Sequence, residues 1–446
     1  MKRESITAIS SLILGLVCLS LLYWNDRLLL GGQKFSFFDE NGDEINCMYY
    51  PGSQDAGILV LHGFSSDQSM MKSITTEYLA LGLHVFTFDF SGHGRSGGGL
   101  GFDNAASDRL SRQLLVAKQH FKSLSGLDSE KIFFLGHSMG ARVALWAETF
   151  DQDPVRGIIL IGSSVNLLPN TQSDFFTGTD DLGLAWVQAL DANNPPTDIL
   201  LITGGWDDIL PPESAGVLFS KLNGNKPVNP IFTRDLEIVP NVFHNYEPYS
   251  PRIIKITKEW VSLRVNSLTG STVDVTIAQT RIALWSGFLI GMFLFLLFFP
   301  MVLDKREKSV KKFESTAEKT IQISNITLFL KQKICLWLLA LPIVLLMGLL
   351  FFLMPIGIPV FNISYVGLIA SYGILLLIMY RKTKVSSVHG QFVPNLKWNG
   401  DKHSLLVGGI FGTISILIGA FFINTGIGYP YLVNIRLFWL DRKSVV

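Results

Sequence analysis

The stretch that decides the fold is Gly136-His137-Ser138-Met139-Gly140. It follows the apolar, β-prone run 131–135 and precedes residues 141–147, which have the pattern of a helix. A serine at the apex of a tight strand-to-helix turn holds its hydroxyl clear of the sheet, and the flanking glycines let strand and helix pass close to the turn. The pattern predicts a nucleophilic serine, although a glycine-rich turn with an incidental serine has the same five letters.

The chain around this turn alternates short apolar runs with helical patterns between about Leu30 and Leu263. Such alternation predicts an α/β domain, a doubly wound and mostly parallel sheet with helices on both faces. The runs with strand character are 57–61, 85–90, 132–135, 157–162, 198–203 and 235–239, and the helical stretches are 70–81, 105–124, 140–150 and 251–261.

Two further side chains complete a candidate catalytic set in the chain order Ser, Asp, His that an α/β-hydrolase uses. Asp207 follows the buried-strand pattern 198–203, and α/β sheets carry functional groups just beyond the carboxyl ends of their strands. Asp208 is the reserve for this role. His244 lies in the loop after the last predicted strand, where it can act as the base that activates the serine.

Acyl transfer also needs backbone N–H groups that stabilise the oxyanion. One is expected from Met139, which comes directly after the candidate nucleophile. The other is expected from Phe64, in the loop that follows the strand 57–61. His62, two residues before Phe64, is expected to hold this loop by hydrogen bonds and not to act as the base.

These segments resemble the α/β-hydrolase superfamily, and most of all its monoglyceride-lipase and serine-aminopeptidase-like branch. The resemblance covers roughly residues 50–265. It implies Ser138 as nucleophile, His244 as general acid/base, Asp207 as its orienting partner, and Phe64 and Met139 as oxyanion donors. The motifs that carry it are His62-Gly63-Phe64, Gly92-His93-Gly94-Arg95-Ser96, Gly136-His137-Ser138-Met139-Gly140, Gly204-x-x-Asp207 and the late His244.

The motifs are specific for the fold and much less specific for the substrate, and this chain departs from many relatives in the segment before the catalytic acid. Many of them insert a sizeable helical cap before the catalytic acid, whereas only residues 163–196 are available here. A short apolar lid and packing of this segment against the core or the membrane are the two alternatives.

The composition of the whole chain points to a membrane protein. Hydrophobic residues make up 48%, charged residues 16%, and the formal net charge of +1 gives no reason to expect a nucleic-acid partner. Residues 6–24 follow Lys2 and Arg3 and are almost wholly apolar, which favours an uncleaved signal anchor in residues 1–29 over a cleaved signal peptide. Four more apolar runs predict a C-terminal membrane domain in residues 266–446, with spans at 282–303, 334–353, 360–380 and 405–422.

The basic residues of the loops predict the orientation of these spans. Lysines and arginines gather at 305–331, between the first and second C-terminal spans, and at 381–384, after the third. The positive-inside rule places these loops and the N-terminus in the cytoplasm and the hydrolase domain, residues 30–265, on the extracytoplasmic side, most simply of the cell membrane. The tail after residue 424 is too short and too charged to be assigned as a span.

The sequence therefore predicts a membrane-anchored serine hydrolase that cleaves an acyl ester of a lipid or another small molecule. No metal or organic cofactor is expected, because the serine, histidine and aspartate suffice for this reaction. Cys18, Cys47 and Cys335 offer no disulfide framework or metal-site spacing. Three alternatives remain: hydrolysis of a peptide or amide, acyl transfer to an acceptor other than water, and a non-catalytic scaffold or transporter subunit. The sequence identifies no protein partner.

Overall fold

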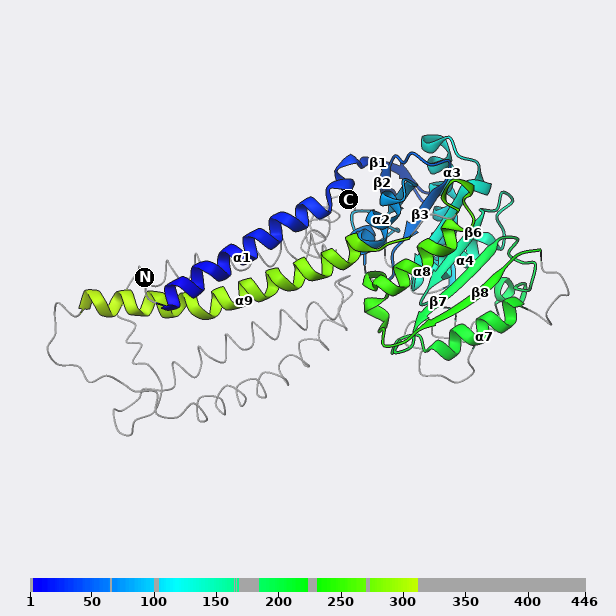
Figure 1. The fold of residues 1–446 in the computed structure, drawn as a ribbon. Coiled ribbons are helices and arrows are strands. Elements are labelled where there is room, and N and C mark those ends of the chain that lie inside the picture. The colour runs from blue at the N-terminus through cyan, green and yellow to red at the C-terminus, as the bar shows by residue number, and fades with distance from the viewer. Residues whose placement is uncertain are drawn as a thin grey trace, which may run out of the picture. The chain divides into compact units, whose positions relative to one another are not determined.

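A computed structural model describes residues 3–64, 66–99, 104–163, 165, 167, 184–223, 231–269 and 273–311 of the chain. The described residues up to Leu303 belong to one compact unit (Figure 1). The predicted spans at 334–353, 360–380 and 405–422 and the tail after 424 lie outside the described residues.

A single mixed sheet forms the centre of the domain, with strand order β1-β2-β4-β3-β5-β6-β7-β8. The six strands from β4 to β8 in this order are parallel, and β1 and β2 are antiparallel to their neighbours. The predicted, mostly parallel sheet is confirmed. The strands are β1 Gln33–Phe38, β2 Glu44–Tyr50, β3 Gly57–Leu61, β4 His84–Phe88, β5 Ile132–His137, β6 Gly157–Ile161, β7 Asp198–Gly204 and β8 Arg234–Val239.

The two antiparallel strands were not among the predicted ones, and their burial explains why. Every residue of β3, β5, β6 and β7 is buried, so these strands have the continuous apolar character of a sheet that is covered on both faces. In β1 only Phe37 is buried, and in β2 exposed or half-buried positions alternate with buried ones as far as Tyr49. Alternation over so few residues, with polar side chains at several positions, is a weak strand signal.

Helices cover both faces of the sheet, as a doubly wound fold requires. One apolar layer joins a sheet face to α3, α4, α6 and α7, and the other joins the opposite face to α2 and α8. The helices are α1 Arg3–Asn25, α2 Lys72–Ala80, α3 Asn104–Ser125, α4 Met139–Glu148, α6 Ala185–Gln188, α7 Pro212–Asn223, α8 Pro251–Ser262 and α9 Thr276–Lys311, with short 3-10 turns η1 Arg27–Gly31, η2 Gln68–Met71, η3 Ser129–Lys131, η5 His244–Tyr249 and η6 Asn266–Leu268.

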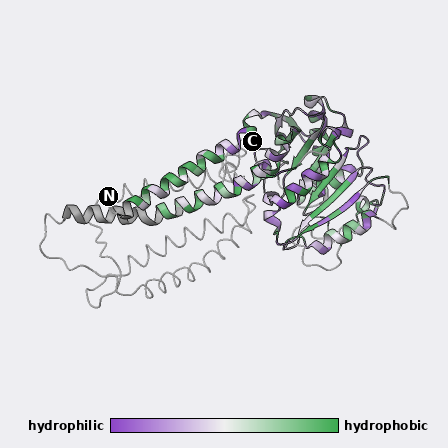
Figure 2. Cartoon of the chain, in the orientation of Figure 1, coloured by the Kyte–Doolittle hydropathy of each residue, from purple (hydrophilic) through white to green (hydrophobic). Residues whose placement is uncertain are grey.

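The N-terminal helix α1 has the length and composition of a membrane span. Within the described part of the chain, Ile6–Asn25 is one helix that is long and apolar enough to cross a membrane, with a mean hydropathy of 2.2. A signal sequence has the same properties. The second predicted span, residues 282–303, lies within the 36-residue helix α9. Figure 2 shows the hydrophobic colouring along α1.

Helices α1 and α9 pack against each other through small side chains. A Cβ added to Gly291 would come within 2.7 Å of the backbone nitrogen of Gly15 and 2.9 Å of the carbonyl oxygen of Ser11, so the two backbones approach closely. Nearer the domain, a Cβ on Gly287 would lie 2.8 Å from Cys18 Sγ. Close backbone approach at glycine and serine is the usual way in which helices associate in a bilayer.

This contact predicts a specific cross-link. A Cβ on Gly287 would lie 3.9 Å from Cys18 Cβ, within the 3.5–4.5 Å that disulfides span, so Gly287→Cys is expected to form a disulfide with Cys18 on mild oxidation. The linkage is read by cleaving the domain with protease and running the fragments on a non-reducing gel. Cys335→Ser serves as the background, and Gly216→Cys, where a Cβ meets nothing within 4 Å, is the matched control. Unlinked fragments from Gly287→Cys would contradict the helix pairing.

A buried ion pair attaches the start of α9 to the domain. Lys258 Nζ of α8 lies 2.6 Å from Glu77 Oε2 of α2, and both side chains are at most 2% exposed. The other carboxylate oxygen of Glu77 accepts a hydrogen bond of 2.8 Å from the backbone N–H of Ala278, in the first turn of α9. One turn later, Arg281 pairs with Asp26, the residue directly after α1. Glu77 therefore binds both α8 and α9.

Candidate active site

Ser138 occupies the sharp turn between β5 and α4. Its backbone has φ 54° and ψ −115°, in the region with positive φ that non-glycine residues seldom adopt. Its N–H donates to the carbonyl of Ile161 at the end of the neighbouring strand β6, and its own carbonyl accepts from Ala141 and Arg142 in α4. These bonds hold a strained backbone in place, as is common at functional sites.

Gly136 and Gly140 lie where the serine turn comes close to other backbone segments, and a side chain there would collide with them. A Cβ on Gly136 would overlap the backbone of Gly140, and a Cβ on Gly140 would come within 2.6 Å of the carbonyl oxygen of His62. Both partners are main-chain atoms and cannot move aside as a flexible side chain could. The five-residue motif therefore fixes the spacing between β5, α4 and the loop after β3.

The structure brings His244 and Asp207 together at the carboxyl edge of the sheet. His244 Nδ1 lies 2.8 Å from Asp207 Oδ2, and both side chains are nearly inaccessible to solvent. The other oxygen of Asp207 accepts from the backbone N–H groups of Ile209 and Leu210, which orients the carboxylate. Asp208, the reserve candidate, is exposed, and its charge makes only a small contribution to the pKa of His244.

Opposing effects act on the pKa of His244, and their balance raises it above the ordinary value of 6.5. Burial lowers the pKa, because it disfavours the imidazolium. The hydrogen bond and negative charge of Asp207, with smaller contributions from Glu247 and Asp208, outweigh burial. The site thus stabilises a charged imidazolium, the form that a general base takes after it has accepted a proton.

The loop after β3 lies directly against the serine turn. A Cβ on Gly63 would lie 3.0 Å from His137 Nδ1 and 3.3 Å from Ser138 Cβ, so a larger residue here would press on the serine turn. His62 fixes the loop: its Nε2 accepts from the N–H of Phe90 at 3.0 Å, which leaves Nδ1 to donate to the carbonyl of Gly63 at 2.8 Å. The expected loop-holding role of His62 is confirmed. Phe64 follows in this loop.

Met139, the other expected oxyanion donor, is the first residue of α4. The N–H groups of a first helical turn have no acceptor within their own helix, and they carry the positive end of the helix dipole. The geometry places the Met139 amide next to Ser138, as the sequence pattern requires. Its role and that of Phe64 in binding an oxyanion stay predictions.

The site also contains a residue that the sequence analysis missed, Glu247, which is completely buried. Its Oε1 accepts from the N–H of Gly204 at 2.6 Å and lies 3.4 Å from Thr203 Oγ1, at the carboxyl end of β7. Its Oε2 lies 3.5 Å from His244 Nδ1 and 3.3 Å from His137 Nε2. The only available signal was a glutamate three residues after the candidate base, within one 3-10 turn.

Burial and the neighbouring charges determine the ionisation of Glu247. Burial raises its pKa, His244 lowers it and Asp207 raises it, with a result of about 8. His137, His244 and Glu247 bring ligand-type atoms within 4.8 Å of one another, the spacing that a metal ion would need. His244 Nδ1 is hydrogen-bonded to Asp207 at 2.8 Å, and His137 Nε2 lies 3.2 Å from the carbonyl oxygen of His244, whereas Glu247 Oε2 has no hydrogen-bond partner within the described residues.

Most of the segment available for a lid, residues 163–196, lies outside the described residues. The parts that are described pack against the core. Trp186 of α6 is nearly buried and stacks on Trp146 of α4, with ring centroids 5.0 Å apart and planes inclined by 11°. Leu167 is also buried in this layer. At these positions the segment packs against the core and does not form a lid.

Comparison with known proteins agrees with this geometry. Residues 52–191 match the family model of the serine aminopeptidases, S33. The chain is 28% identical over 135 residues to a monoglyceride lipase homolog of Monkeypox virus, covering 29% of this chain and 46% of the relative. It is 26% identical over 201 residues to an uncharacterized protein of Mycobacterium tuberculosis, covering 41% and 65%. The chain thus spans less than two thirds of the length of these curated relatives.

The comparison with solved structures also found similar chains. A thermophilic esterase from Thermogutta terrifontis is 18% identical, with a TM-score of 0.40, and the match covers 52% of this chain and 100% of the esterase.

Proposed function

Because this chain carries a domain of the α/β-hydrolase superfamily, we propose that it is a membrane-anchored serine hydrolase that cleaves acyl esters. The observation that carries the proposal is the buried 2.8 Å contact between His244 and Asp207 at the same sheet edge as Ser138. Ser138 itself has a strained backbone that is typical of a nucleophile on a tight turn. A lipid ester or another small acyl ester is the substrate class.

The residues fit an acyl-enzyme mechanism. His244 takes the proton of the Ser138 hydroxyl as its oxygen attacks the acyl carbonyl, and Asp207 stabilises the imidazolium. The N–H groups of Met139 and Phe64 receive the negative charge of the tetrahedral oxyanion. His244 then returns the proton to the leaving alcohol, which yields the acyl-enzyme. Water activated by His244 attacks this ester and releases the acid.

A covalent probe tests the proposal directly. Membranes that contain the full chain are labelled with a fluorescent fluorophosphonate, which phosphonylates activated serines. Labelling is expected for the wild type and is expected to disappear in Ser138→Ala and in His244→Ala. A membrane-impermeant form of the probe on intact cells tests the extracytoplasmic placement in the same experiment. A folded wild type that takes up no probe would overturn the enzyme proposal.

Amide hydrolysis is the second candidate, and the serine aminopeptidase family match favours it. Both reactions use the same nucleophile and base, so the fluorophosphonate does not separate them. The ratio of kcat/KM for a p-nitrophenyl ester to that for the corresponding aminoacyl p-nitroanilide does. We expect this ratio to favour the ester; faster cleavage of the anilide would assign the chain to peptide hydrolysis.

The raised pKa of His244 predicts the pH dependence of the reaction. The base must be neutral to accept the serine proton, so kcat/KM is expected to rise with pH through a midpoint above 6.5. Asp207→Asn removes the carboxylate charge that raises the pKa, and so is expected to move this midpoint to lower pH and to reduce the maximal rate about 10⁴-fold. The measurement is kcat/KM for a soluble ester from pH 5 to 9. Asp208→Asn, at the exposed neighbour, is the matched control and should move the midpoint only slightly.

A further inference from the structure

Two exposed aromatic side chains flank the candidate catalytic pair. Trp206 directly precedes Asp207 and is 53% exposed, and Phe243 directly precedes His244 and is 51% exposed. Their rings contact each other, with centroids 5.2 Å apart. Tyr246, in the 3-10 turn that begins at His244, is 40% exposed. We call these three residues the aromatic rim.

The first and last helices of the described chain join the domain at this same edge of the sheet. Helix α2 follows the loop at the carboxyl end of β3, so its first residue, Lys72, lies at the carboxyl edge. Helix α9 runs antiparallel to α2: Ala278 is bound by Glu77, and Arg281, one turn later, interacts electrostatically with Lys72. Continuing in this direction, α9 leaves the domain beyond the carboxyl edge.

Helix α1 reaches the domain at the same place. Asp26, directly after α1, pairs with Arg281 and interacts with Lys72. Trp24 and Tyr23, in the last turn of α1, are 66% and 67% exposed, and Trp24 stacks with Arg27. Aromatic and basic residues at the end of an apolar helix are typical of the boundary between lipid tails and head groups.

We propose that the carboxyl edge of the sheet faces the bilayer and that the aromatic rim inserts into its interface. Tryptophan, tyrosine and phenylalanine are favoured there, because part of each ring leaves water while polar atoms stay hydrated. The rim lies beside Asp207 and His244, so an amphiphile can present its ester to the site while its acyl chain stays in the membrane. Only this last statement, on the substrate, rests on the proposed hydrolase function.

The test measures location and does not depend on activity. The full chain, with Cys335→Ser, is labelled with a nitroxide at Trp206→Cys or Phe243→Cys and reconstituted in phosphatidylcholine vesicles; the unsubstituted background corrects for labelling of Cys18 and Cys47, which are buried. Collision rates with apolar O₂ and with water-soluble nickel ethylenediaminediacetate are then compared. Leu263→Cys is the matched control, since Leu263 is apolar, 71% exposed and follows α8 at the opposite edge of the sheet.

We expect O₂ collisions to dominate at positions 206 and 243 and nickel collisions to dominate at 263. Nickel access at 206 and 243 equal to that at 263 would show that the rim faces water and would overturn the proposal. Low collision rates with both reagents would overturn it too, because they would mean that a protein segment or a second copy covers the rim. Failure of the hydrolase proposal appears separately, as absence of fluorophosphonate labelling.

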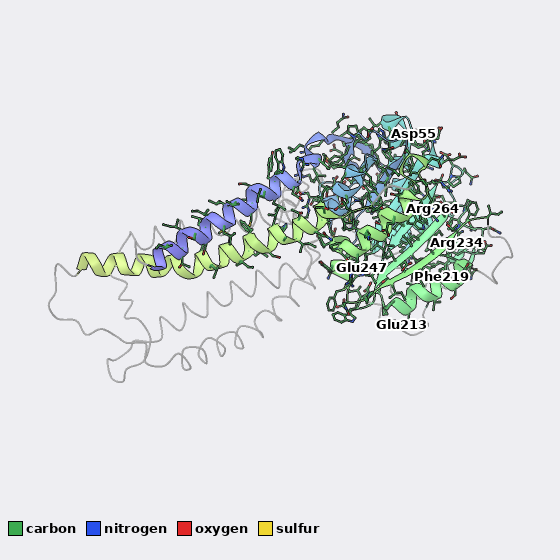
Figure 3. The ribbon with its side chains drawn as sticks, viewed as in Figure 1. Asp55, Glu213, Phe219, Arg234, Glu247 and Arg264 are labelled. Carbon is green, nitrogen blue, oxygen red and sulfur yellow. The ribbon has the colours of Figure 1, made fainter. Side chains whose placement is uncertain are left out.

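A different observation supports a second inference, on Glu247. Its carboxyl group joins the carboxyl end of β7, through Gly204 and Thr203, to His244 and His137. Glu247 lies beyond the carboxyl end of β8, whereas Arg234 begins that strand (Figure 3). We infer that Glu247 is a positioning residue that holds the imidazole of His244 and replaces Asp207 as the acceptor for Nδ1–H when Asp207 is removed.

The charges around Glu247 give the reason for this replacement. Burial is the largest cause of the raised pKa of Glu247, and the charge of His244 opposes it. The negative charge of Asp207 raises this pKa further. Removal of Asp207 abolishes this repulsion, so Glu247 ionises more readily beside the imidazole, 3.5 Å from Nδ1. A water molecule or a small shift of the turn suffices to complete the contact.

The experiment compares Asp207→Ala with Asp207→Ala/Glu247→Gln in the hydrolysis of a soluble ester from pH 5 to 9. Asp207→Ala is expected to keep a residual rate, and this rate is expected to be at least fivefold lower in the double variant. Glu247→Gln alone is expected to move the acidic limb of the pH–rate profile to lower pH. Equal rates for the two Asp207→Ala variants and an unmoved limb in Glu247→Gln would overturn the inference. If Glu247→Gln fails to fold, Glu247→Asp, which keeps the charge but shortens the reach, provides the same comparison.

Discussion

Replacing Ser138 with alanine is expected to lower kcat/KM for a soluble p-nitrophenyl ester by at least about a thousandfold, and by up to about a millionfold. The hydroxyl oxygen forms the bond to the acyl group, and no other atom of the turn can take its place. The substitution removes one oxygen and keeps the backbone bonds to Ile161 and to α4, so the fold should be unchanged. The rate is measured on the full chain in detergent micelles.

The matched controls separate loss of chemistry from loss of structure. Ser220→Ala changes a serine on the exposed side of α7 and should keep the wild-type rate. Ser138→Ala/His244→Ala should be no slower than either single variant, because nucleophile and base act as a unit. More than a tenth of the wild-type rate in Ser138→Ala would contradict the assignment of Ser138 as nucleophile.

Lys258→Met is the second substitution with a large expected effect, here on stability. It leaves the carboxylate of Glu77 buried without its partner, which costs about 3–5 kcal/mol for buried pairs. For a domain of this size such a loss lowers the midpoint of thermal unfolding by roughly 10 °C. The midpoint is read by circular dichroism in micelles. Faster protease cleavage between α8 and α9 is also expected, since Lys258 binds the carbonyl of Asp274 in that connection.

The double variant Glu77→Leu/Lys258→Met tests the cause. Replacing both partners of a buried pair by apolar residues is often nearly neutral, so most of the lost stability should return. Protease sensitivity should return only in part, because the N–H of Ala278 also loses its acceptor, Glu77. Lys255→Met, at an exposed residue on the same helix, is the control and should change little. Equal destabilisation by Lys255→Met and Lys258→Met would contradict the argument.

Much of the fold could be predicted because the parallel strands are buried on both faces. Strands β3, β5, β6 and β7 have continuous apolar runs, and the motifs that carry the resemblance lie at the ends of β3, β5 and β7. Strand β1, at the edge of the sheet, and its neighbour β2 could not be predicted in this way, because many of their positions are exposed or half-buried. Their position depends on pairing with β4, a contact between residues far apart in the sequence.

Part of the candidate site could likewise be predicted from the sequence, and part of it could not. Ser138, Asp207 and His244 lie just after strands, where the topology alone brings them to one edge. The sequence favours Asp207 over Asp208, and the structure adds the physical difference between them: one carboxylate is buried against the imidazole and the other is exposed. Glu247 has no motif of its own, and its importance follows from the burial of its carboxyl group between β7 and His244.

The pairing of Asp26 with Arg281 has a consequence for the architecture of the whole chain. Asp26 lies where the chain enters the domain, and Arg281 lies just after the chain leaves it. The two side chains are in contact, although 254 residues lie between them in the sequence. The domain is thus topologically an insertion, a loop whose two ends are joined at its base, and chains tolerate insertions at such points. The contacts of α1 with α9 are expected to hold the two helices together without the domain, so a short linker from residue 26 to residue 276 is expected to be able to replace the domain, as is a different domain with adjoining termini.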